Sequence, residues 1–236
     1  MTDVPEARPA STVVLLRDST GGLETLLLKR NKALIFAGGM WVFPGGSLDQ
    51  EDFDAAGGDL EGAARIAAAR EALEEAGVTP APARMVQLSH WTTPVGEPRR
   101  FSTWIFAAPL DSDDEVVIDG GEIHDAQWLP VREAVARHEA GELGMLPPTF
   151  ITLCNLSRYD SVDEAVSSER ETPVPEVFPV MLIEDDRMVV LFRGDAGYED
   201  KSLCAAGARH RAELRGASWA YVREDVPPAY PPLIPE

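Results

Sequence analysis

Three glutamates in the first third of the chain have a spacing that suits chemistry on a cation. Glu71, Glu74 and Glu75 are three or four residues apart in an alanine-rich segment, so a helix there presents them on one face. Like charges so close together destabilise an isolated helix unless water or a cation offsets them. Hard divalent cations such as Mg²⁺ prefer carboxylate oxygens and retain waters and substrate phosphates. The spacing is therefore compatible with a metal site, and a solvated acidic face is the alternative.

The elements around this cluster are expected to fix its position. Residues 60–76 are rich in Ala, Leu, Arg and Glu, which favour helices, with Asp59 as N-cap and Gly77 as C-cap. Upstream, Trp41-Val42-Phe43 is typical of a short strand and is halted by Pro44-Gly45-Gly46. Glycine carbonyls in such a turn can approach a metal because no side chain intervenes. The sequence thus predicts a glycine turn beside a carboxylate-bearing helix.

The segment Arg70-Glu71-Ala72-Leu73-Glu74-Glu75-Ala76-Gly77-Val78 resembles the second half of the Nudix box, R-E-U-x-E-E-x-G-U, at every fixed position. Gly45-Gly46 resembles the opening glycines of that box. Membership of the Nudix family implies an α/β/α sandwich with a mixed sheet. It also implies hydrolysis of a diphosphate linked to another moiety, with Mg²⁺ or Mn²⁺ as cofactor.

One part of the box differs from the family pattern. Where the first box glutamate is expected, seven residues before the Arg, this chain has Gly62. The stretch from Gly46 to Arg70 is also longer than usual by about ten residues, so 47–60 resembles an insertion. Glu61, Glu51 or no residue at all is left to replace the missing glutamate.

The insertion and the Val42-Phe43-Pro44-Gly45-Gly46 run resemble the branch of the family around the peroxisomal coenzyme A diphosphatases. This resemblance extends over roughly residues 13–158. The coenzyme A signature of that branch places two arginines four residues apart before the glycine turn. Asn31 and Ile35 occupy those positions here, with Arg30 adjacent.

The resemblance implies roles for the box residues. Glu71 and Glu75 are expected to ligate the main cation, Glu74 to share the metal cluster, and the Gly45 carbonyl to complete the shell. Arg70 is expected to pair with a box carboxylate and orient it. These assignments predict a metal-dependent active site on one helix and one turn.

Residues outside the box are further candidates. Glu122, in a loop before an expected strand, is a candidate extra ligand or general base, and a solvated loop acid is the alternative. Arg99 and Arg100 form the clearest basic pair of an acidic chain, and arginine binds phosphate oxygens bidentately. With Arg30, they are candidates for holding the substrate, although a surface pair is the alternative.

Composition limits the function classes. The 236 residues carry 21 Lys and Arg against 40 Asp and Glu, a net charge of −19. Such a surface disfavours nucleic acid, whose binding depends on basic residues that neutralise phosphates. Apolar runs are too short for a membrane helix, no signal peptide is expected, and Cys154 and Cys204 are expected to be reduced. Composition therefore predicts a cytoplasmic protein, and the resemblance implies a small-molecule diphosphate substrate.

Other segments give the expected organisation. Strands are predicted at 12–16, 25–29, 85–88, 102–107 and 126–129, and helices at 130–142, 147–158 and 161–170. A Nudix domain at 8–158 is expected to be followed by a linker at 159–176 and a C-terminal extension at 177–236. The extension is expected to contain a hairpin (177–183 and 187–192) and a strand at 218–222, and it is a candidate for homodimer contacts.

Three functions are left open. The first is a Nudix diphosphatase acting on coenzyme A, an acyl-coenzyme A or a similar molecule. The second is the same chemistry on ADP-ribose, a dinucleotide or a sugar nucleotide. The third is a module that senses a nucleotide without cleaving it, which would be expected to lack one or more box carboxylates, whereas this chain retains Arg70, Glu71, Glu74 and Glu75.

Overall fold

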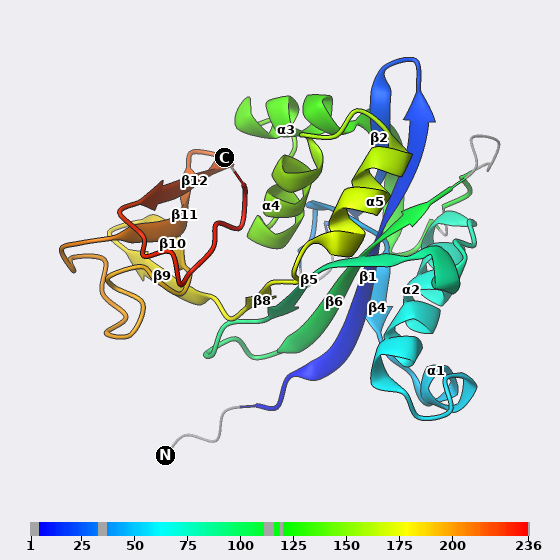
Figure 1. The fold of residues 1–236 in the computed structure, drawn as a ribbon, viewed down its shortest axis with the longest axis horizontal. Helices are drawn as coiled ribbons and strands as arrows, with labels where there is room; N and C mark the ends of the chain where they lie inside the picture. Colours follow the sequence, from blue (N-terminus) through cyan, green and yellow to red (C-terminus); the bar gives the residue numbers. More distant parts are fainter. Residues whose placement is uncertain (1–4, 33–36, 111–115, 119, 236) are drawn as a thin grey trace.

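A computed structural model describes residues 5–32, 37–110, 116–118 and 120–235 (Figure 1). The strands of the first part of the chain are β1 (Arg8–Ser19), β2 (Gly22–Arg30), β3 (Trp41–Val42), β4 (Gly45–Ser47), β5 (Val86–Thr92), β6 (Phe101–Pro109), β7 (Ile123–Pro130) and β8 (Glu176–Val177). The helices are α1 (Gln50–Ala55), α2 (Leu60–Ala76), the 3₁₀ turn η1 (Pro82–Arg84), α3 (Val131–Glu139), α4 (Pro147–Leu156) and α5 (Val162–Glu171). The last strands are β9 (Val180–Glu184), β10 (Arg187–Leu191), β11 (Arg209–Arg215) and β12 (Ser218–Glu224).

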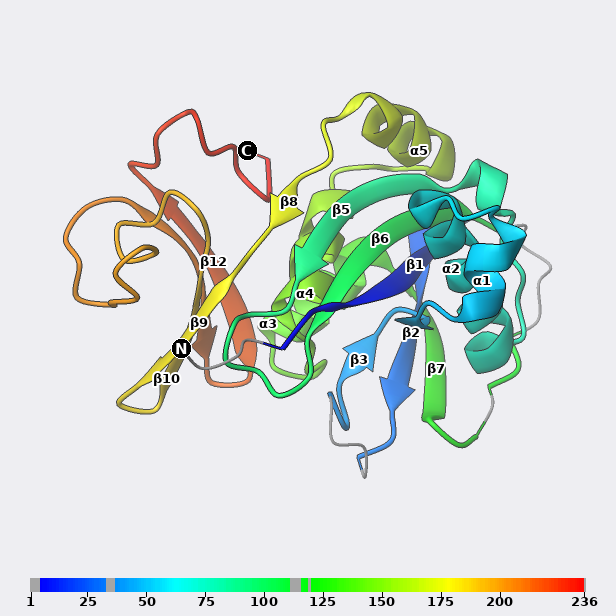
Figure 2. The ribbon, with the colours of Figure 1, turned by 90° about the horizontal axis from the view of Figure 1, so that it is seen from below.

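The main sheet is mixed and is organised around the long strand β1. Its order is β3-β2-β1-β6-β5-β8, with β4 paired to β1 and β7 paired to β2. β1 pairs parallel with β6 from Arg8 to Leu16, while residues 10–12 pair antiparallel with β4 and the end of β1 forms a hairpin with β2. One strand therefore contacts both the glycine turn and the start of β6 (Figure 2).

Helices cover both faces of this sheet, as the sequence of β1 requires. Val13 and Leu15 point to the face covered by α2, and Val14 and Leu16 point to the opposite face. All four are fully buried, and a strand that is apolar on both faces needs a layer on each. Figure 1 shows α2 on one side and α3, α4 and α5 on the other. The predicted α/β/α sandwich is confirmed.

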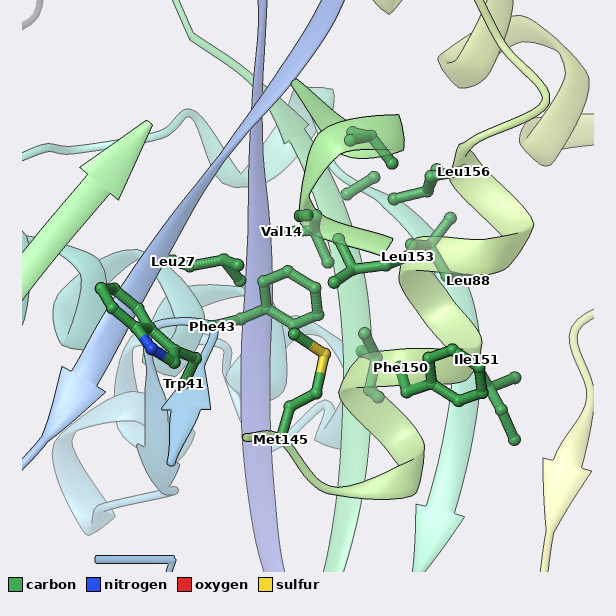
Figure 3. Packing of buried hydrophobic residues seen from close by; sticks show 14 of the residues in the cluster. Val14, Leu27, Trp41, Phe43, Leu88, Met145, Phe150, Ile151, Leu153 and Leu156 are labelled. Carbon is green, nitrogen blue, oxygen red and sulfur yellow. The ribbon is translucent and has the colours of Figure 1, made fainter. Parts of the chain in front are cut away.

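Small side chains let α2 approach the sheet closely. Its buried face consists mainly of alanines, such as Ala64, Ala68 and Ala72, which pack against β1, β2 and β6. On the opposite face, larger side chains fill the space between the sheet and α4, among them Phe43, Met145 and Phe150 (Figure 3). The site-bearing helix is thus held at short range against the strands that carry the rest of the site.

The C-terminal strands form a second, antiparallel sheet in the order β12-β11-β10-β9. Trp219 of β12 is buried, and its indole Nε1 donates to the Met145 carbonyl at 2.9 Å. Its backbone N–H donates to Nε2 of the buried His138 in α3, also at 2.9 Å. Trp219 belongs to the same apolar cluster as Phe43 and Phe150. The C-terminal extension is therefore joined to the first part of the chain by a shared core.

Most predicted elements are present, including the helix at 161–170, which is α5. Three features were not predicted. The segment 47–60, which resembled an insertion, contains the end of β4 and the helix α1. The strand β11 is a second such feature. The third is β8, which begins at the end of the expected linker and pairs parallel with β5 in the main sheet. The boundaries of the proposed domains stay a prediction.

No helix among the described residues combines the length and apolarity that crossing a membrane requires.

Candidate active site

The predicted site residues lie around one groove of about 670 Å³. The groove lies between the C-terminal half of α2, the glycine turn of β4 and the N-terminal parts of β1 and β6. Its lining includes the candidate catalytic, metal-ligating and substrate-binding residues other than Arg100: Arg30, Gly45, Arg70, Glu71, Glu74, Glu75, Arg99 and Glu122. It lacks Glu51 and Glu61, the candidates for the missing box glutamate. The sequence analysis therefore identified groups that the fold brings together.

Both ends of α2 are fixed as predicted. The Asp59 carboxylate accepts a hydrogen bond from the Gly62 N–H at 2.7 Å and caps the first turn. Gly77 ends the helix in the left-handed region with φ 73°, which glycine adopts at little cost. These caps fix where the helix begins and ends, and the buried alanine face fixes the side on which the glutamates lie.

Glu75 is the most buried of the three glutamates, with 9% of its side chain exposed. The Gly45 N–H donates to its Oε2 at 3.0 Å, and Nη1 of Arg30 lies 3.9 Å from its Oε1. Burial raises the pKa of Glu75 to about 7, with the neighbouring Glu71 adding to the effect. A cation that enters the groove would therefore stabilise the charged form of this buried carboxylate.

Glu71 and Glu74 share the guanidinium of Arg70. Nη1 of Arg70 donates to Glu71 Oε1 at 2.8 Å and lies 3.4 Å from Glu74, which is more than half exposed. Burial raises the pKa of Glu71, and the hydrogen bond from Arg70 partly opposes this rise. Arg70 thus pairs with a box carboxylate in the structure, and its orienting role remains a proposal.

Arg70 has a second carboxylate partner that was not predicted. Its Nη2 and Nε donate to the two carboxylate oxygens of Asp52 at 3.0 and 3.3 Å, and Nη2 also donates to the Ser47 carbonyl at 3.0 Å. Only 3% of the Asp52 side chain is exposed. The hydrogen bond to Asp52 is the largest cause of the raised pKa of Arg70. Asp52 therefore anchors the arginine that holds Glu71.

The insertion exists as a short helix that presents Asp52. The Asp49 N–H donates to Asp52 Oδ2 at 2.8 Å, so the same carboxylate also stabilises the first turn of α1. Neither residue considered from the sequence contacts Arg70: Glu61 pairs with Arg65 at 2.7 Å, and Glu51 is exposed. In the sequence, Asp52 is recognisable only as an aspartate three residues after Asp49 in an acidic turn. This position does not identify Arg70 as its partner.

The two glycines of the turn are required by close contacts. A Cβ at Gly45 would collide with the Ser11 carbonyl and the Thr12 side chain, and it would lie 2.8 Å from the Thr12 Cα. A Cβ at Gly46 would collide with the carboxylate of Glu71. The contact seen for Gly45 uses its N–H, which holds Glu75. A role for its carbonyl as a metal ligand stays a proposal.

Arg30 and Glu122 face each other across the mouth of the groove. Nη2 of Arg30 lies 3.2 Å from Glu122 Oε2, and the Asn31 N–H donates to the Glu122 carbonyl at 2.8 Å. Arg30 therefore bridges Glu75 and Glu122, which places Glu122 within the site. Its role as base or ligand stays a proposal. Ile35, the second position of the coenzyme A signature, lies outside the described residues.

Arg99 and Arg100 differ in their surroundings. Arg100 donates to the carbonyls of Thr93 and Pro5 at 3.1 and 2.8 Å and faces away from the glutamates. Arg99 is exposed at the edge of the groove. The structure thus leaves Arg99 as the member of the pair that can reach a ligand in this groove.

Comparison with known proteins decides the family. The NUDIX domain model matches residues 7–148, more than half of the chain. The chain belongs to the Nudix family. It is a Nudix hydrolase, and enzymes of this family cleave diphosphate bonds with the help of divalent metal ions.

Relatives and solved structures agree with this assignment. The putative nudix hydrolase 7 of Caenorhabditis elegans is 25% identical over 232 residues, covering 83% of this chain and 76% of that protein. The acyl-coenzyme A diphosphatase NUDT19 of Gallus gallus is 31% identical over 120 residues, which are 48% of this chain and 32% of that protein. A NUDIX hydrolase from Alicyclobacillus acidocaldarius is 25% identical and has a TM-score of 0.64, covering 71% of this chain and 99% of the other.

The donor set fits a hard divalent cation. Within the described ranges, no three His, Cys, Asp or Glu side chains converge as ligands of one ion. Two buried or half-buried carboxylates on the same helix face, Glu71 and Glu75, do line the groove. Mg²⁺ is commonly held by one or two carboxylates, with waters and substrate phosphates as its other ligands. The chemistry of these two carboxylates is therefore compatible with the divalent metal ions that the family uses.

Proposed function

We propose that this Nudix hydrolase cleaves the diphosphate of coenzyme A or an acyl-coenzyme A. The observation that carries the hydrolysis is the groove in which Glu71 and Glu75 face the glycine turn at Gly45 and Gly46. The choice of substrate is supported by the similarity to an acyl-coenzyme A diphosphatase. It is also supported by an inserted segment of the kind seen in that branch of the family.

Glu71 and Glu75 would hold the metal, with Glu74 at the outer edge. When bound, Mg²⁺ or Mn²⁺ would supply neutralisation of the diphosphate oxygens and a more acidic water. Arg70 holds Glu71 from one side, and the Gly45 N–H holds Glu75 from the other. Because both carboxylates are already oriented, little reorganisation is needed when the substrate enters.

Arg30 and Glu122 act at the mouth of the groove. Arg30 is only 18% exposed and offers a planar cation between Glu75 and Glu122, a geometry that suits phosphate oxygens. Glu122 is exposed and is positioned by Arg30, so it is a candidate base for the attacking water. In this arrangement a substrate phosphate replaces one of the carboxylates around Arg30.

The test is product analysis by mass spectrometry with Mg²⁺ or Mn²⁺. The panel contains coenzyme A, an acyl-coenzyme A, ADP-ribose, NADH and diadenosine polyphosphates, and Glu75→Gln is the inactive comparison. Phosphopantetheine plus adenosine 3′,5′-bisphosphate, absent with the variant, is the expected result. AMP plus ribose phosphate as the only products would assign the enzyme to ADP-ribose instead. Absence of any product would contradict the proposal.

A further inference from the structure

A second groove continues from the active site along the N-terminal segment. Its volume is about 860 Å³, and it is lined by residues 5–9, Ser47 and residues 98–101. Ser47, Arg99 and Phe101 line both grooves. The carbonyl of Ser47 is held by Arg70 of the active site. A ligand that occupies the first groove can therefore extend into the second without leaving the protein surface.

Backbone hydrogen bonds give this second groove a fixed wall. The Arg8 N–H donates to the Arg100 carbonyl at 2.9 Å, and the Leu48 N–H donates to the Pro9 carbonyl at 3.1 Å. Arg100 then donates from Nη1 to the Pro5 carbonyl at 2.8 Å. The N-terminal segment is thus joined to β6 on one side and to the inserted segment on the other.

The groove is rich in positive charge within an acidic protein. Arg8, Arg99 and Arg100 all line it, and none of the three forms an ion pair with a carboxylate among the described residues. Arg100 is occupied by neutral carbonyls, whereas Arg8 and Arg99 are exposed. Glu6 also lines the groove and is the acidic group that partly offsets this charge.

By contrast, the other two arginines of the catalytic groove, Arg30 and Arg70, are already paired. Arg70 contacts Asp52, Glu71 and Glu74, and Arg30 contacts Glu75 and Glu122. In a chain with a net charge of −19, adjacent arginines without acidic partners create a local positive field that attracts an anion. The distribution of charge therefore distinguishes a metal-binding groove from an anion-binding groove next to it.

We infer that Arg8 and Arg99 bind a second phosphate group of the substrate, a phosphate monoester on the nucleoside half that is separate from the cleaved diphosphate. The inference rests on the proposed diphosphatase function for the orientation of the substrate. It specifies the substrate class as nucleotides that carry an additional phosphate on the ribose. Arg100 positions the N-terminal wall through Pro5 and contributes charge at longer range.

The test compares ligands that differ by one phosphate. Isothermal titration with AMP, adenosine 2′,5′-bisphosphate and adenosine 3′,5′-bisphosphate is carried out on the full chain and on Arg8→Gln and Arg99→Gln. Arg84→Gln is the matched control, because Arg84 is also exposed, has no ion pair among the described residues and lines neither groove. Circular dichroism confirms that each variant is folded.

We expect one bisphosphate to bind the unaltered chain about fivefold more tightly than AMP, at the upper end for an exposed charged pair. Arg8→Gln and Arg99→Gln should each remove most of that difference, and Arg84→Gln should preserve it. Equal affinity for all three ligands, or a preference that survives both substitutions, overturns the inference.

The titration measures binding and is independent of catalysis. In a parallel experiment, hydrolysis of coenzyme A and dephospho-coenzyme A is measured with Mg²⁺. Cleavage of both at equal kcat/KM, with no effect of Arg99→Gln on their ratio, would retain the diphosphatase and reject the phosphate subsite. Tighter binding of a bisphosphate without hydrolysis of either compound would support the subsite and reject the proposed function.

Discussion

Replacing Asp52 by Asn tests whether the inserted helix supports the catalytic helix. Asp52 is buried, and its carboxylate accepts two hydrogen bonds from Arg70 and one from the Asp49 N–H. Asparagine has nearly the same shape but lacks the charge, and its amide nitrogen cannot accept a hydrogen bond from Arg70. The substitution therefore weakens both the anchor of Arg70 and the first turn of α1.

The size of the effect follows from the burial of the pair. Removing one partner of a fully buried ion pair costs about 3–5 kcal/mol. Arg70 is 24% exposed and keeps Glu71, Glu74 and the Ser47 carbonyl, and Asn retains one acceptor. We therefore expect a loss of about 2 kcal/mol in the free energy of unfolding, within the range for a hydrogen bond to a charged group. Because Arg70 then holds Glu71 less firmly, kcat should fall about tenfold, as for other groups that orient metal ligands.

The assay pairs urea denaturation with steady-state kinetics at saturating Mg²⁺. Asp54→Asn is the control, since Asp54 lies in the same helix and its carboxylate accepts only from the exposed side chain of Gln50. The control should change stability by less than about 0.5 kcal/mol, as is usual for surface substitutions. If Asp52→Asn matched Asp54→Asn in both stability and kcat, the support of Arg70 by Asp52 would be refuted.

Three other substitutions give distinct results. Gly46→Ala places a methyl group against the Glu71 carboxylate, so kcat should fall at least tenfold, as when a catalytic group is displaced by about 1 Å, while circular dichroism remains unchanged; an active variant would contradict the close contact. Glu75 has a pKa raised to about 7 in the folded state, so the metal-free protein should lose stability as the pH rises from about 4.5 to 7. Glu75→Gln should remove this loss and make the variant more stable than the unaltered chain at pH 8, by up to about 3 kcal/mol, in urea titrations with EDTA; identical pH profiles would refute the assignment. Trp219→Ala should cost about 3–5 kcal/mol and lower the stability of both sheets in one transition, since Trp219 contacts His138 and Met145; two separate transitions in calorimetry would show that the sheets unfold independently.

Local signals allowed much of the fold to be predicted. The caps of α2 at Asp59 and Gly77 depend on adjacent residues, and the hairpin of β1 and β2 depends on a short glycine turn, so both are visible in the sequence. The predicted cluster of Glu71, Glu74 and Glu75 also follows from helical spacing alone. These features needed no knowledge of distant contacts.

The missed features depend on partners far away in the sequence. Asp52 is buried because it meets Arg70, which is 18 positions later. The sequence of β11 is polar, and one of its buried side chains is Arg211. Arg211 can be buried because it pairs with Asp195 at 2.7 Å. From the sequence alone, Asp52 and Arg211 are both expected at the surface. Their burial could not be predicted without knowing which distant residues they meet in the fold.

β1 also sets a length scale for the substrate. Thr12 lies beside Gly45 of the turn that holds Glu75, and Arg8 lies beside Phe101 at the entrance of the second groove. Four residues of extended strand separate these two positions, or about 13 Å at roughly 3.3 Å per residue. One strand thus fixes the backbone distance between the turn that holds Glu75 and the groove lined by Arg8 and Arg99. Because the long arginine side chains span part of this distance, the strand sets an upper limit on how far apart the two anionic groups of one ligand can lie if both are to be contacted at once.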